Sequence, residues 1–523
     1  MNPQFSPNFK EWLTQNRWTP TTLGDFLGVK RQSVHNWIEG KSFPKNKAVL
    51  QKLLSLSPDI IKFPNGKHPF PQTLKTQKMN EYFEIIGGQK LSGRISIPGA
   101  KNGALPMLCA ALLTTQTCEF INVPNITDIR LLLDIFETLG AVVERDLVNG
   151  KVKITAQNID PEKLEHCPQA KKFRASILIV GPLLARFGHA KILKPGGCII
   201  GARPNDVHLN GFEAFGAKVT DKGNQIELNF DGKLKQSTIS KLCLTNENQT
   251  EEEIIHPQVL LPEASVTATE NLAMFAAGTA GTSEIFFTAM ETHVTATVQM
   301  LADMGAQIDG IGTHHLTIRG LKAPNLKGGT FRIPPDGLLA ATYGIAGILT
   351  EGDVWIENVN HHELLSFYGV LKRTGASFEF FDNTLHIFGK QNLKAIPKLQ
   401  TAIFPGFSTD LQSPFGVLLT QCEGSSIIFE TLFENRLTYL SELEKMGANV
   451  SLLNAHQAQV TGKTPLKGTS VQSWDLRAGA AMVLAGLIAK GTTKVTNIDY
   501  IDRGYENFEK NLQSLGAQIT RKS

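Results

Sequence analysis

The stretch Met304-Gly305-Ala306-Gln307-Ile308-Asp309 reads as the end of a helix followed by the start of an alternating strand. Glycine suits the left-handed conformation at a helix C-terminus because it has no Cβ to clash with the backbone. The same Gly-Ala pair recurs at intervals of roughly seventy to ninety residues, which is the size of a supersecondary unit. The other five copies are Leu139-Gly140-Ala141, Phe215-Gly216-Ala217, Thr374-Gly375-Ala376, Met446-Gly447-Ala448 and Leu515-Gly516-Ala517. The repeat predicts an α/β protein of six units, which divide most simply as three plus three.

Length and composition exclude several classes of protein. A chain of 523 residues is too long for one core and predicts two to four domains. The net charge of +4 is too weak to imply a polyanionic partner, and the six cysteines include no C-x-x-C pair of the kind that binds zinc. No apolar run reaches the roughly eighteen residues that span a bilayer, and the N-terminus has no signal-peptide pattern. We therefore expect a cytoplasmic protein.

A cysteine loop is the strongest chemical signal in the chain. In Lys194-Pro195-Gly196-Gly197-Cys198, proline and the glycine pair break regular structure, so Cys198 is expected on a loop that can approach a ligand. Arg203, Lys194 and Arg174 lie nearby in sequence, and such cations favour the thiolate. A thiol tuned in this way can attack carbon or deliver a proton. The alternative is a half-buried cysteine in a surface turn.

Three segments around this loop carry a family resemblance. They are Arg174-Ala175-Ser176, Asp206-Val207-His208-Leu209 and, upstream, Ile97-Pro98-Gly99-Ala100-Lys101-Asn102-Gly103-Ala104-Leu105-Pro106. Together they resemble the UDP-N-acetylglucosamine enolpyruvyl transferase (1-carboxyvinyltransferase) family, from about Tyr82 to the C-terminus. The resemblance implies an enzyme that transfers the enolpyruvyl group of phosphoenolpyruvate to the 3-hydroxyl of UDP-N-acetylglucosamine and releases phosphate.

The resemblance also implies an architecture. The expected fold is α/β, with two similar inside-out barrels of three βαβαββ-like units each and helices at their centres. Residues 81–100 and 335–523 are expected to form the first domain, and residues 101–334 the second, which carries the cysteine loop. An enzyme of this family serves peptidoglycan precursor synthesis, and through it cell-wall biogenesis, cell shape, the cell cycle and cell division. It is also a target of fosfomycin, which alkylates the cysteine.

No metal or other cofactor is expected. Two histidine pairs, His314-His315 and His361-His362, invite a metal interpretation. Adjacent side chains point to different sides of the backbone, so we interpret both pairs as loop and strand-end residues.

A small, highly charged substrate such as phosphoenolpyruvate needs several cations with planar, bidentate geometry. Lys101-Asn102 precedes an apolar run that reads as a helix start, where free N–H groups favour an anion. The residues that the resemblance assigns to phosphoenolpyruvate are Lys101, Asn102, Arg203, Arg477 and Arg503.

The resemblance assigns three catalytic roles. Cys198 is the acid that protonates the methylene carbon, Asp410 removes the proton of the sugar hydroxyl, and Lys101 holds the developing charge. From local sequence alone, Asp410 has a second interpretation as a helix N-cap. The residues assigned to the nucleotide sugar are Asn102, Arg174, Arg203, Pro204, Asn205, Asp206, Val207, Ser265, Val266, Asp410 and Leu432.

The chain departs from the family pattern on the acceptor side. The family reads Pro-Asp-Arg-Ile-Glu where this chain has Gly337 and Leu339, so an arginine and a glutamate are lost together, which indicates a missing ion pair. Met290 replaces a basic residue, and Glu263 stands where some members place a lysine. The acceptor therefore stays open: a paralogue with another acceptor is one alternative. Another is 5-enolpyruvylshikimate-3-phosphate synthase, against which the Cys198 loop argues.

Residues 1–62 read as a separate module, followed by a turn-rich linker at 63–80. Two short helical patterns joined at Gly28 look like the helix-turn-helix of Cro-type repressors, which predicts a small all-α domain. Its second helix would present Lys30, Arg31, Gln32, Ser33, His35 and Asn36 to DNA. One alternative is a helical interaction module without DNA. Another is a regulator that binds DNA and senses nucleotide sugar through a degenerate enzyme domain.

Overall fold

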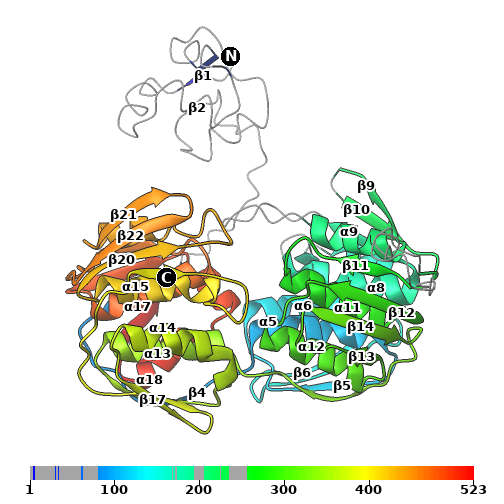
Figure 1. The fold of residues 1–523 in the computed structure, drawn as a ribbon, viewed down its shortest axis with the longest axis horizontal. Helices are drawn as coiled ribbons and strands as arrows, with labels where there is room; N and C mark the ends of the chain where they lie inside the picture. The colour runs from blue at the N-terminus through cyan, green and yellow to red at the C-terminus, as the bar shows by residue number, and fades with distance from the viewer. Residues whose placement is uncertain are drawn as a thin grey trace, which may run out of the picture. The chain divides into compact units, whose positions relative to one another are not determined.

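The computed structural model describes residues 4–5, 30, 33–34, 61–62, 81–167, 169–170, 174–193, 205–223, 225–234 and 256–523. The chain divides into two compact units, Met1–Met79 and Asn80–Ser523 (Figure 1).

Few residues of the first unit are described. Strand β1 (Gln4–Phe5) pairs antiparallel with β2 (Ile61–Lys62), Ser33 and Val34 are helical, and Lys30 is exposed. The strand pair departs from the all-helical prediction because it joins the two ends of the module, which the helical pattern does not reach. Four residues predicted to contact DNA lie outside the described residues: Arg31, Gln32, His35 and Asn36.

The second unit contains two separate hydrophobic cores. One includes buried residues from Ala104 to Ile333, and we call the elements around it the continuous lobe. The other combines residues 83–97 with residues 339–519, and we call its elements the split lobe because two distant pieces of sequence build it.

Three sheets and their helices form the continuous lobe. The sheets have the strand orders β15-β5-β7-β6, β8-β10-β9 and β11-β12-β14-β13. The strands are β5 (Cys118–Ile121), β6 (Val142–Asp146), β7 (Lys151–Thr155), β8 (His189–Leu193), β9 (Lys218–Asp221), β10 (Gln225–Asn229), β11 (Gln258–Leu260), β12 (Gly281–Phe286), β13 (Gln307–Asp309), β14 (His315–Gly320) and β15 (Gly329–Arg332). The helices are α5 (Lys101–Ala110), η3 (Ala111–Leu113), α6 (Thr127–Leu139), η4 (Pro161–His166), η5 (Arg174–Ile179), α8 (Val180–Phe187), α9 (Asp206–Phe215), α11 (Val266–Ala277) and α12 (Thr292–Asp303).

Three further sheets form the split lobe, with the strand orders β17-β18-β16-β4, β19-β20-β22-β21 and β23-β24-β3-β25. The strands are β3 (Tyr82–Ile86), β4 (Ser92–Ser96), β16 (Asp353–Glu357), β17 (Phe378–Phe381), β18 (Thr384–Ile387), β19 (Lys398–Gln400), β20 (Gly424–Phe429), β21 (Asn449–Asn454), β22 (Gln457–Gly462), β23 (Ser470–Gln472), β24 (Thr492–Thr496) and β25 (Gln518–Lys522). The helices are α13 (Gly337–Leu349), η6 (His361–Leu364), α14 (Leu365–Arg373), η7 (Thr409–Leu411), α15 (Gln412–Thr420), α16 (Leu440–Lys445), α17 (Leu476–Ile488), η8 (Ile498–Arg503) and α18 (Phe508–Ser514).

The sheets repeat one pairing pattern. Each four-stranded sheet joins one parallel pair to two antiparallel pairs, and the sheet of β8, β9 and β10 keeps only the two antiparallel pairs among the described strands. The glycine of every Gly-Ala copy has a positive φ, between 77° and 114°. The sequence prediction of left-handed glycines at six helix ends is therefore confirmed.

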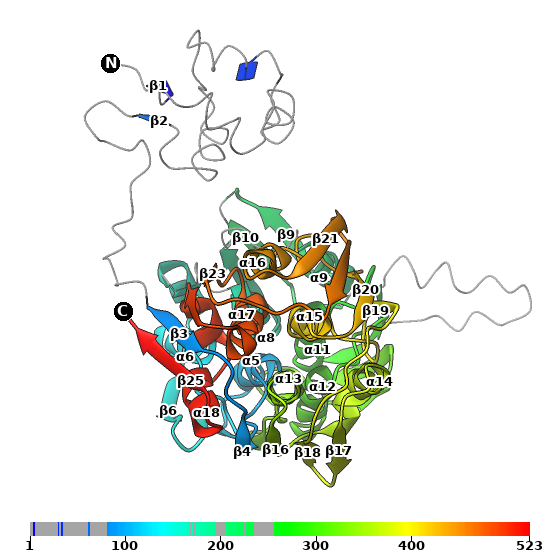
Figure 2. The same cartoon turned by 90° about the vertical axis from the view of Figure 1, so that its left-hand side faces the viewer.

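Helices rich in alanine and glycine lie inside the split lobe. Residues 477–487 of α17 are buried along their whole length, and α17 packs against both α13 and α15 (Figure 2). A helix without a polar face is stable only when it is surrounded, because every side of it must leave water.

Two neighbouring chain segments join the lobes. The Ala100 N–H donates to the Pro334 carbonyl at 2.7 Å, and the Asp336 N–H donates to the Pro98 carbonyl at 3.0 Å. Gly99 also forms an isolated bridge with Pro335. Helices α5 and α13 therefore begin side by side, one in each lobe.

Candidate active site

An ion-pair cluster centred on the buried Asp128 spans the two lobes at the start of α5. The Lys101 Nζ lies 2.6 Å from Asp128 Oδ2, and Arg503 Nε lies 3.0 Å from Asp128 Oδ1. Lys101 and Asp128 belong to α5 and α6 of the continuous lobe, whereas Arg503 ends η8 of the split lobe. The Asp128 side chain is only 2% exposed, so its carboxylate holds cations from both lobes in a site largely closed to water.

The protonation equilibria follow from this geometry. Burial alone would raise the pKa of Asp128, but the charges of Lys101 and Arg503 hold it below its ordinary value. Burial lowers the pKa of Lys101 against the attraction of Asp128, and the neighbouring charges of Arg503 and Arg477 lower it further. Three cations that repel one another are thus kept together, an arrangement that a polyanion would stabilise.

Asp128→Asn is expected to lower the free energy of unfolding by about 3 to 5 kcal/mol at pH 7, because removal of one partner leaves buried charge uncompensated. The pKa of Asp128 is lower in the folded protein than its ordinary value of 3.8, so this stabilisation is present above pH 3.8 and is lost as the pH falls further. Urea unfolding at pH 7 and at pH 3 measures the change. Asp134→Asn on the same helix is the control, because Asp134 is 41% exposed. Equal losses in the two variants would contradict the role of Asp128.

A second ion-pair cluster surrounds Asp410. Arg436 Nη2 lies 2.7 Å from Asp410 Oδ1, and Arg477 Nη2 lies 3.2 Å from Asp410 Oδ2. The side chains of Arg436 and Arg477 are 3% and 4% exposed. The N-cap of η7 is Ser408, whose side chain accepts from the Asp410 N–H. The Asp410 carboxylate therefore binds two guanidinium groups, and its interpretation as a helix N-cap is wrong.

Both guanidinium groups are held as cations. Burial acts to lower the pKa of Arg436, but Asp410 raises it above its ordinary value. The pKa of Arg477 is also raised, by the nearby groups of Tyr505 and Asp410 against the effect of burial. The Arg477 guanidinium also lies 5.3 Å from the centre of the Tyr505 ring, within the range of a cation–π contact.

The two clusters adjoin, because the charge of Arg477, which pairs with Asp410, lies near enough to Lys101 to lower its pKa. A Cβ placed on Gly504 would lie 3.2 Å from Lys101 Cδ, so the Arg503-Gly504 backbone passes directly along the lysine side chain. We call Lys101, Arg436, Arg477 and Arg503 the cation cluster. Three of the predicted phosphoenolpyruvate residues, Lys101, Arg477 and Arg503, thus meet from α5, α17 and η8.

Acidic groups border the cation cluster. The Asp336 carboxylate caps α13 by accepting from the Leu339 N–H, and the backbone N–H of Lys101 lies near enough to act to lower its pKa. Burial raises the pKa of Asp336, against the charge of Arg477. Asp336 therefore lies where the first turns of α5 and α13 meet.

Buried polar atoms without a hydrogen-bond partner also lie near the junction of the lobes. They include Glu291 Oε2, His293 Nε2 and Glu363 Oε2. Burial lowers the pKa of His293 to about 4, so its imidazole is neutral at pH 7, and burial raises the pKa of Glu291. Unpaired buried groups are costly, and they mark positions where water or a ligand donates the missing hydrogen bonds.

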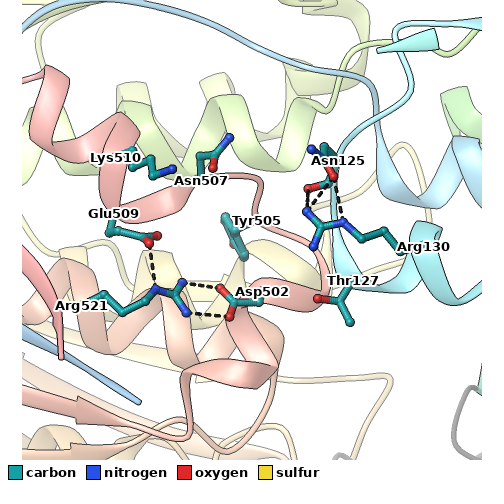
Figure 3. A pocket seen from close by; sticks show the side chains of 9 residues that line it. All are labelled: Asn125, Thr127, Arg130, Asp502, Tyr505, Asn507, Glu509, Lys510 and Arg521. Atoms are coloured by element: carbon teal, nitrogen blue, oxygen red, sulfur yellow. Dashed lines mark hydrogen bonds and ion pairs between the residues drawn. The ribbon is translucent and has the colours of Figure 1, made fainter. Parts of the chain in front are cut away.

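A cavity of about 220 Å³ adjoins the site. Its lining combines residues of both lobes: Asn125, Thr127, Arg130, Asp502, Tyr505, Asn507, Glu509, Lys510 and Arg521. Figure 3 shows the Arg521 guanidinium between Asp502 and Glu509, with Nη2 of Arg521 2.7 Å from Asp502 Oδ1. Because Arg521 is paired with Asp502 and Glu509, its side chain ties β25 to η8 and α18.

The residues predicted to bind the nucleotide sugar lie at element starts. Arg174 begins η5, Asn205 is the N-cap of α9, and Ser265 is the N-cap of α11, without a side-chain capping bond. Val207 is buried within α9, whereas Leu432 is 38% exposed. The remaining predicted positions are Asn102, half-buried on α5, Asp206, exposed at the start of α9, and Val266, half-buried at the start of α11.

Three predicted residues, Cys198, Arg203 and Pro204, lie outside the described residues. Their assigned roles remain predictions. The sequence did not single out Asp128, Asp336, His293 or Glu363, because each stands in a helical or turn segment whose local pattern is ordinary.

Two further observations limit other interpretations. Among the described residues, no helix is long and apolar enough to cross a membrane. Within those same residues, one group of carboxylates could meet a metal ion, formed by Glu81, Asp499 and Asp502. An acidic group of this kind is common without a metal, and Asp502 is already paired with Arg521.

The chain is similar to known proteins over most of its length. A family model described as EPSP synthase (3-phosphoshikimate 1-carboxyvinyltransferase) matches residues 85–512. The UDP-N-acetylglucosamine 1-carboxyvinyltransferase of Campylobacter hominis is 40% identical over 443 residues, which cover 85% of this chain and 100% of that protein. The protein of the same name from Desulfosudis oleivorans is 38% identical over 437 residues, or 84% of this chain and 98% of the relative.

Solved structures share the fold at lower identity. The enolpyruvyl transferase NikO from Streptomyces tendae superposes with a TM-score of 0.71 at 22% identity, covering 85% of this chain and 99% of that one. EPSP synthase from Acinetobacter baumannii gives a TM-score of 0.64 at 18% identity, covering 85% of this chain and all of that one.

Proposed function

The chain belongs to the EPSP synthase family of enolpyruvyl transferases and has their fold, and we propose that it transfers the enolpyruvyl group of phosphoenolpyruvate to the 3-hydroxyl of UDP-N-acetylglucosamine, with release of phosphate. It is a transferase, and its place is in peptidoglycan precursor synthesis. Relatives at about 40% identity that are covered end to end support the choice of acceptor.

One observation of the structure carries the proposal. Lys101, Arg477 and Arg503 come from three elements of two lobes and converge around the carboxylates of Asp128 and Asp410. Phosphoenolpyruvate combines a phosphate and a carboxylate on three carbons, so it can displace these carboxylates from several cations at once. The unmasked cations then stabilise the charge that develops during transfer.

The reaction proceeds by addition and elimination. The Cys198 thiol protonates the methylene carbon of phosphoenolpyruvate, and the neighbouring carbon becomes electrophilic. The sugar hydroxyl forms a C–O bond to that carbon while its proton passes to Asp410. The Cys198 thiolate then takes a proton back from the new methyl group as phosphate departs with the electrons of its C–O bond, which restores the double bond. Asp410 acts next to Arg436 and Arg477, which favour its ionised, proton-accepting form.

The proposal also assigns the two domains and the position of the nucleotide sugar. Residues 101–334 form the domain that carries the cysteine loop, and residues 81–100 with 335–523 form its partner, each an inside-out barrel with its helices inside. The nucleotide sugar lies along the N-termini of η5, α9 and α11, whose free N–H groups suit a diphosphate. Leu432, which is exposed, packs against the sugar.

A phosphate-release assay tests the acceptor. Purified protein with phosphoenolpyruvate and UDP-N-acetylglucosamine is expected to release phosphate, with a ratio of kcat to KM at least about 100-fold above that with shikimate-3-phosphate, since a site with unpaired polar groups rejects the wrong acceptor strongly. Mass spectrometry of the product confirms a gain of one enolpyruvyl group. Release with shikimate-3-phosphate alone would overturn the choice of acceptor, and silence with both would overturn the proposed activity.

A separate proposal concerns the N-terminal module. We propose that residues 1–62 form a DNA-binding helix-turn-helix attached through a linker at 63–80; most of these residues lie outside the described ones, among which Lys30 is exposed. The match to the curated relatives covers 85% of the chain, so the enzyme does not require this module for its family fold.

A further inference from the structure

A completely buried carboxyl group lies at the end of β20. Glu430 follows directly after that strand and is 0% exposed. Removing a carboxyl group from water costs free energy unless hydrogen bonds replace its hydration. The donors around Glu430 therefore show which parts of the split lobe this side chain holds together.

One oxygen of Glu430 holds the segment that follows it. The backbone N–H groups of Leu432 and Phe433 donate to Oε1 at 2.9 and 3.3 Å. The Thr401 hydroxyl donates to the same oxygen at 3.0 Å and accepts from the Thr431 N–H at 2.9 Å. These bonds fix the turn that carries Leu432, the residue proposed to pack against the sugar.

The other oxygen of Glu430 holds the segment of the proposed general base. The Thr409 hydroxyl donates to Oε2 at 2.8 Å. Thr409 begins η7 and directly precedes Asp410. We call residues 409–411 the base segment and residues 431–436 the sugar segment. One buried carboxyl group thus ties together two segments that lie about twenty residues apart in sequence.

A second connection closes a ring between the two segments. Arg436 Nη2 lies 2.7 Å from Asp410 Oδ1, and the Arg436 N–H donates to the Phe433 carbonyl at 3.2 Å. Because Phe433 and Thr409 both donate to Glu430, the ring returns to that carboxyl group. The ion pair fixes the carboxylate of Asp410, whereas the hydrogen bond of Thr409 fixes the backbone that carries it.

We propose that Glu430 is a positioning residue for enolpyruvyl transfer: it holds the base segment against the sugar segment, so that Asp410 meets the sugar hydroxyl at hydrogen-bond distance. A general base must lie within reach of the proton that it takes, and small errors in its position are costly. Because Glu430 is completely buried, it acts through Asp410 and not on the substrate. The inference rests on the proposed function for its kinetic readout.

The main test changes Thr409, because removal of the Glu430 carboxyl group leaves two backbone N–H groups without an acceptor, a cost that can unfold the chain. Thr409→Val keeps the shape of the side chain and removes only its hydroxyl group. It is expected to lower kcat at least about tenfold with KM for UDP-N-acetylglucosamine unchanged within about twofold, because a misplaced base slows the chemical step and leaves the contacts of the sugar intact.

Two further variants control for the loss of a hydroxyl group. Thr409→Ser keeps the donor to Glu430, so its kcat is expected to stay within about threefold of that of the unmodified protein. Thr438→Val removes a hydroxyl at an exposed position just beyond the sugar segment and is expected to leave kcat unchanged. Equal losses of kcat in Thr409→Val and Thr409→Ser, or no loss in either, would contradict the role of Glu430.

Glu430→Gln separates hydrogen bonding from charge. Glutamine keeps one oxygen for the N–H groups of Leu432 and Phe433, and its amide group can donate to the Thr409 hydroxyl in place of accepting from it. We expect kcat within about threefold of that of the unmodified protein, since all the bonded positions keep a partner. A loss as large as that of Thr409→Val would assign the effect to the charge of Glu430 and reject the proposed link.

Hydrogen exchange measured by mass spectrometry needs no substrate and separates this inference from the proposed activity. Peptides that contain the base segment are expected to exchange at least about fivefold faster in Thr409→Val than in the unmodified protein, and at the unmodified rate in Thr409→Ser. Equal exchange in Thr409→Val and the unmodified protein would overturn the inference even if phosphate is released. Absence of phosphate release from the unmodified protein would overturn the proposed function, whereas faster exchange in Thr409→Val would still support the link through Glu430.

Discussion

Replacing Asp410 by asparagine should lower kcat for enolpyruvyl transfer by about 10² to 10⁴-fold, the usual loss when a general base is removed. Asparagine has nearly the same shape but cannot take the proton of the sugar hydroxyl. It also removes the charge that pairs with Arg436 and Arg477, both of which are almost completely buried. The two guanidinium groups then attract phosphoenolpyruvate more strongly, so KM for phosphoenolpyruvate should fall or stay unchanged while kcat collapses.

Steady-state phosphate release at saturating concentrations of both substrates measures this change. Asp382→Asn is the matched control, because Asp382 is exposed in a turn with a φ of 50° that asparagine adopts equally well. A urea midpoint for the Asp410 variant checks that the chain remains folded. A kcat within tenfold of the unmodified protein would exclude Asp410 as the base.

Cys198→Ala should abolish measurable turnover and remove labelling by fosfomycin. Without the thiol, no group is assigned to protonate the methylene carbon, and the first step has no acid. The other cysteines within the described residues are poor competitors for the reagent. Cys109, Cys118, Cys167 and Cys422 are all buried, and burial raises the pKa of Cys118 and Cys422 to about 12.

Mass spectrometry of the intact protein after fosfomycin treatment counts the labelled thiols. We expect one adduct on the unmodified protein, none on Cys198→Ala and one on Cys243→Ala, which controls for the loss of a cysteine elsewhere. Full turnover by Cys198→Ala, or an adduct that persists in it, would reject the role of this cysteine.

Repeated local patterns were predictable from the sequence. Where the chain turns in a left-handed conformation at a helix end, backbone sterics favour glycine. Each of the six Gly-Ala pairs therefore marked the end of a helix. The start of α5 at Lys101 was predicted for a similar reason, because an apolar run follows directly after it. The Gly-Ala helix ends and the start of α5 each depend on a few adjacent residues, so they can be predicted without knowledge of the tertiary structure.

The interior of the site depends on contacts that no local pattern encodes. From sequence, Asp128 is an ordinary acidic residue in the first turn of α6. It becomes part of the site only because Lys101 and Arg503, from other elements, form ion pairs with it in the folded chain. Asp410 was open to a capping interpretation because Ser408 and Asp410 are both good capping residues, and the backbone geometry selected Ser408.

The departures from the family pattern at Gly337 and Leu339 could be read from the sequence, but the residue that fills the space at Gly337 could not. Their joint change predicts an altered region. The prediction of a missing ion pair could not reveal its replacement, because Glu363 lies in a different segment and occupies the space only through packing.

The course of the chain through the split lobe has a consequence for biosynthesis. Phe83 in β3 pairs with Val495 in β24 and with Arg521 in β25, so β3 cannot pair until these two strands, far later in the sequence, have been synthesised. The continuous lobe closes much sooner, when β15 reaches β5. The nascent polypeptide therefore leaves β3 without its partner strands until β24 and β25 have been made, and a chain that ends before β24 keeps the split lobe open.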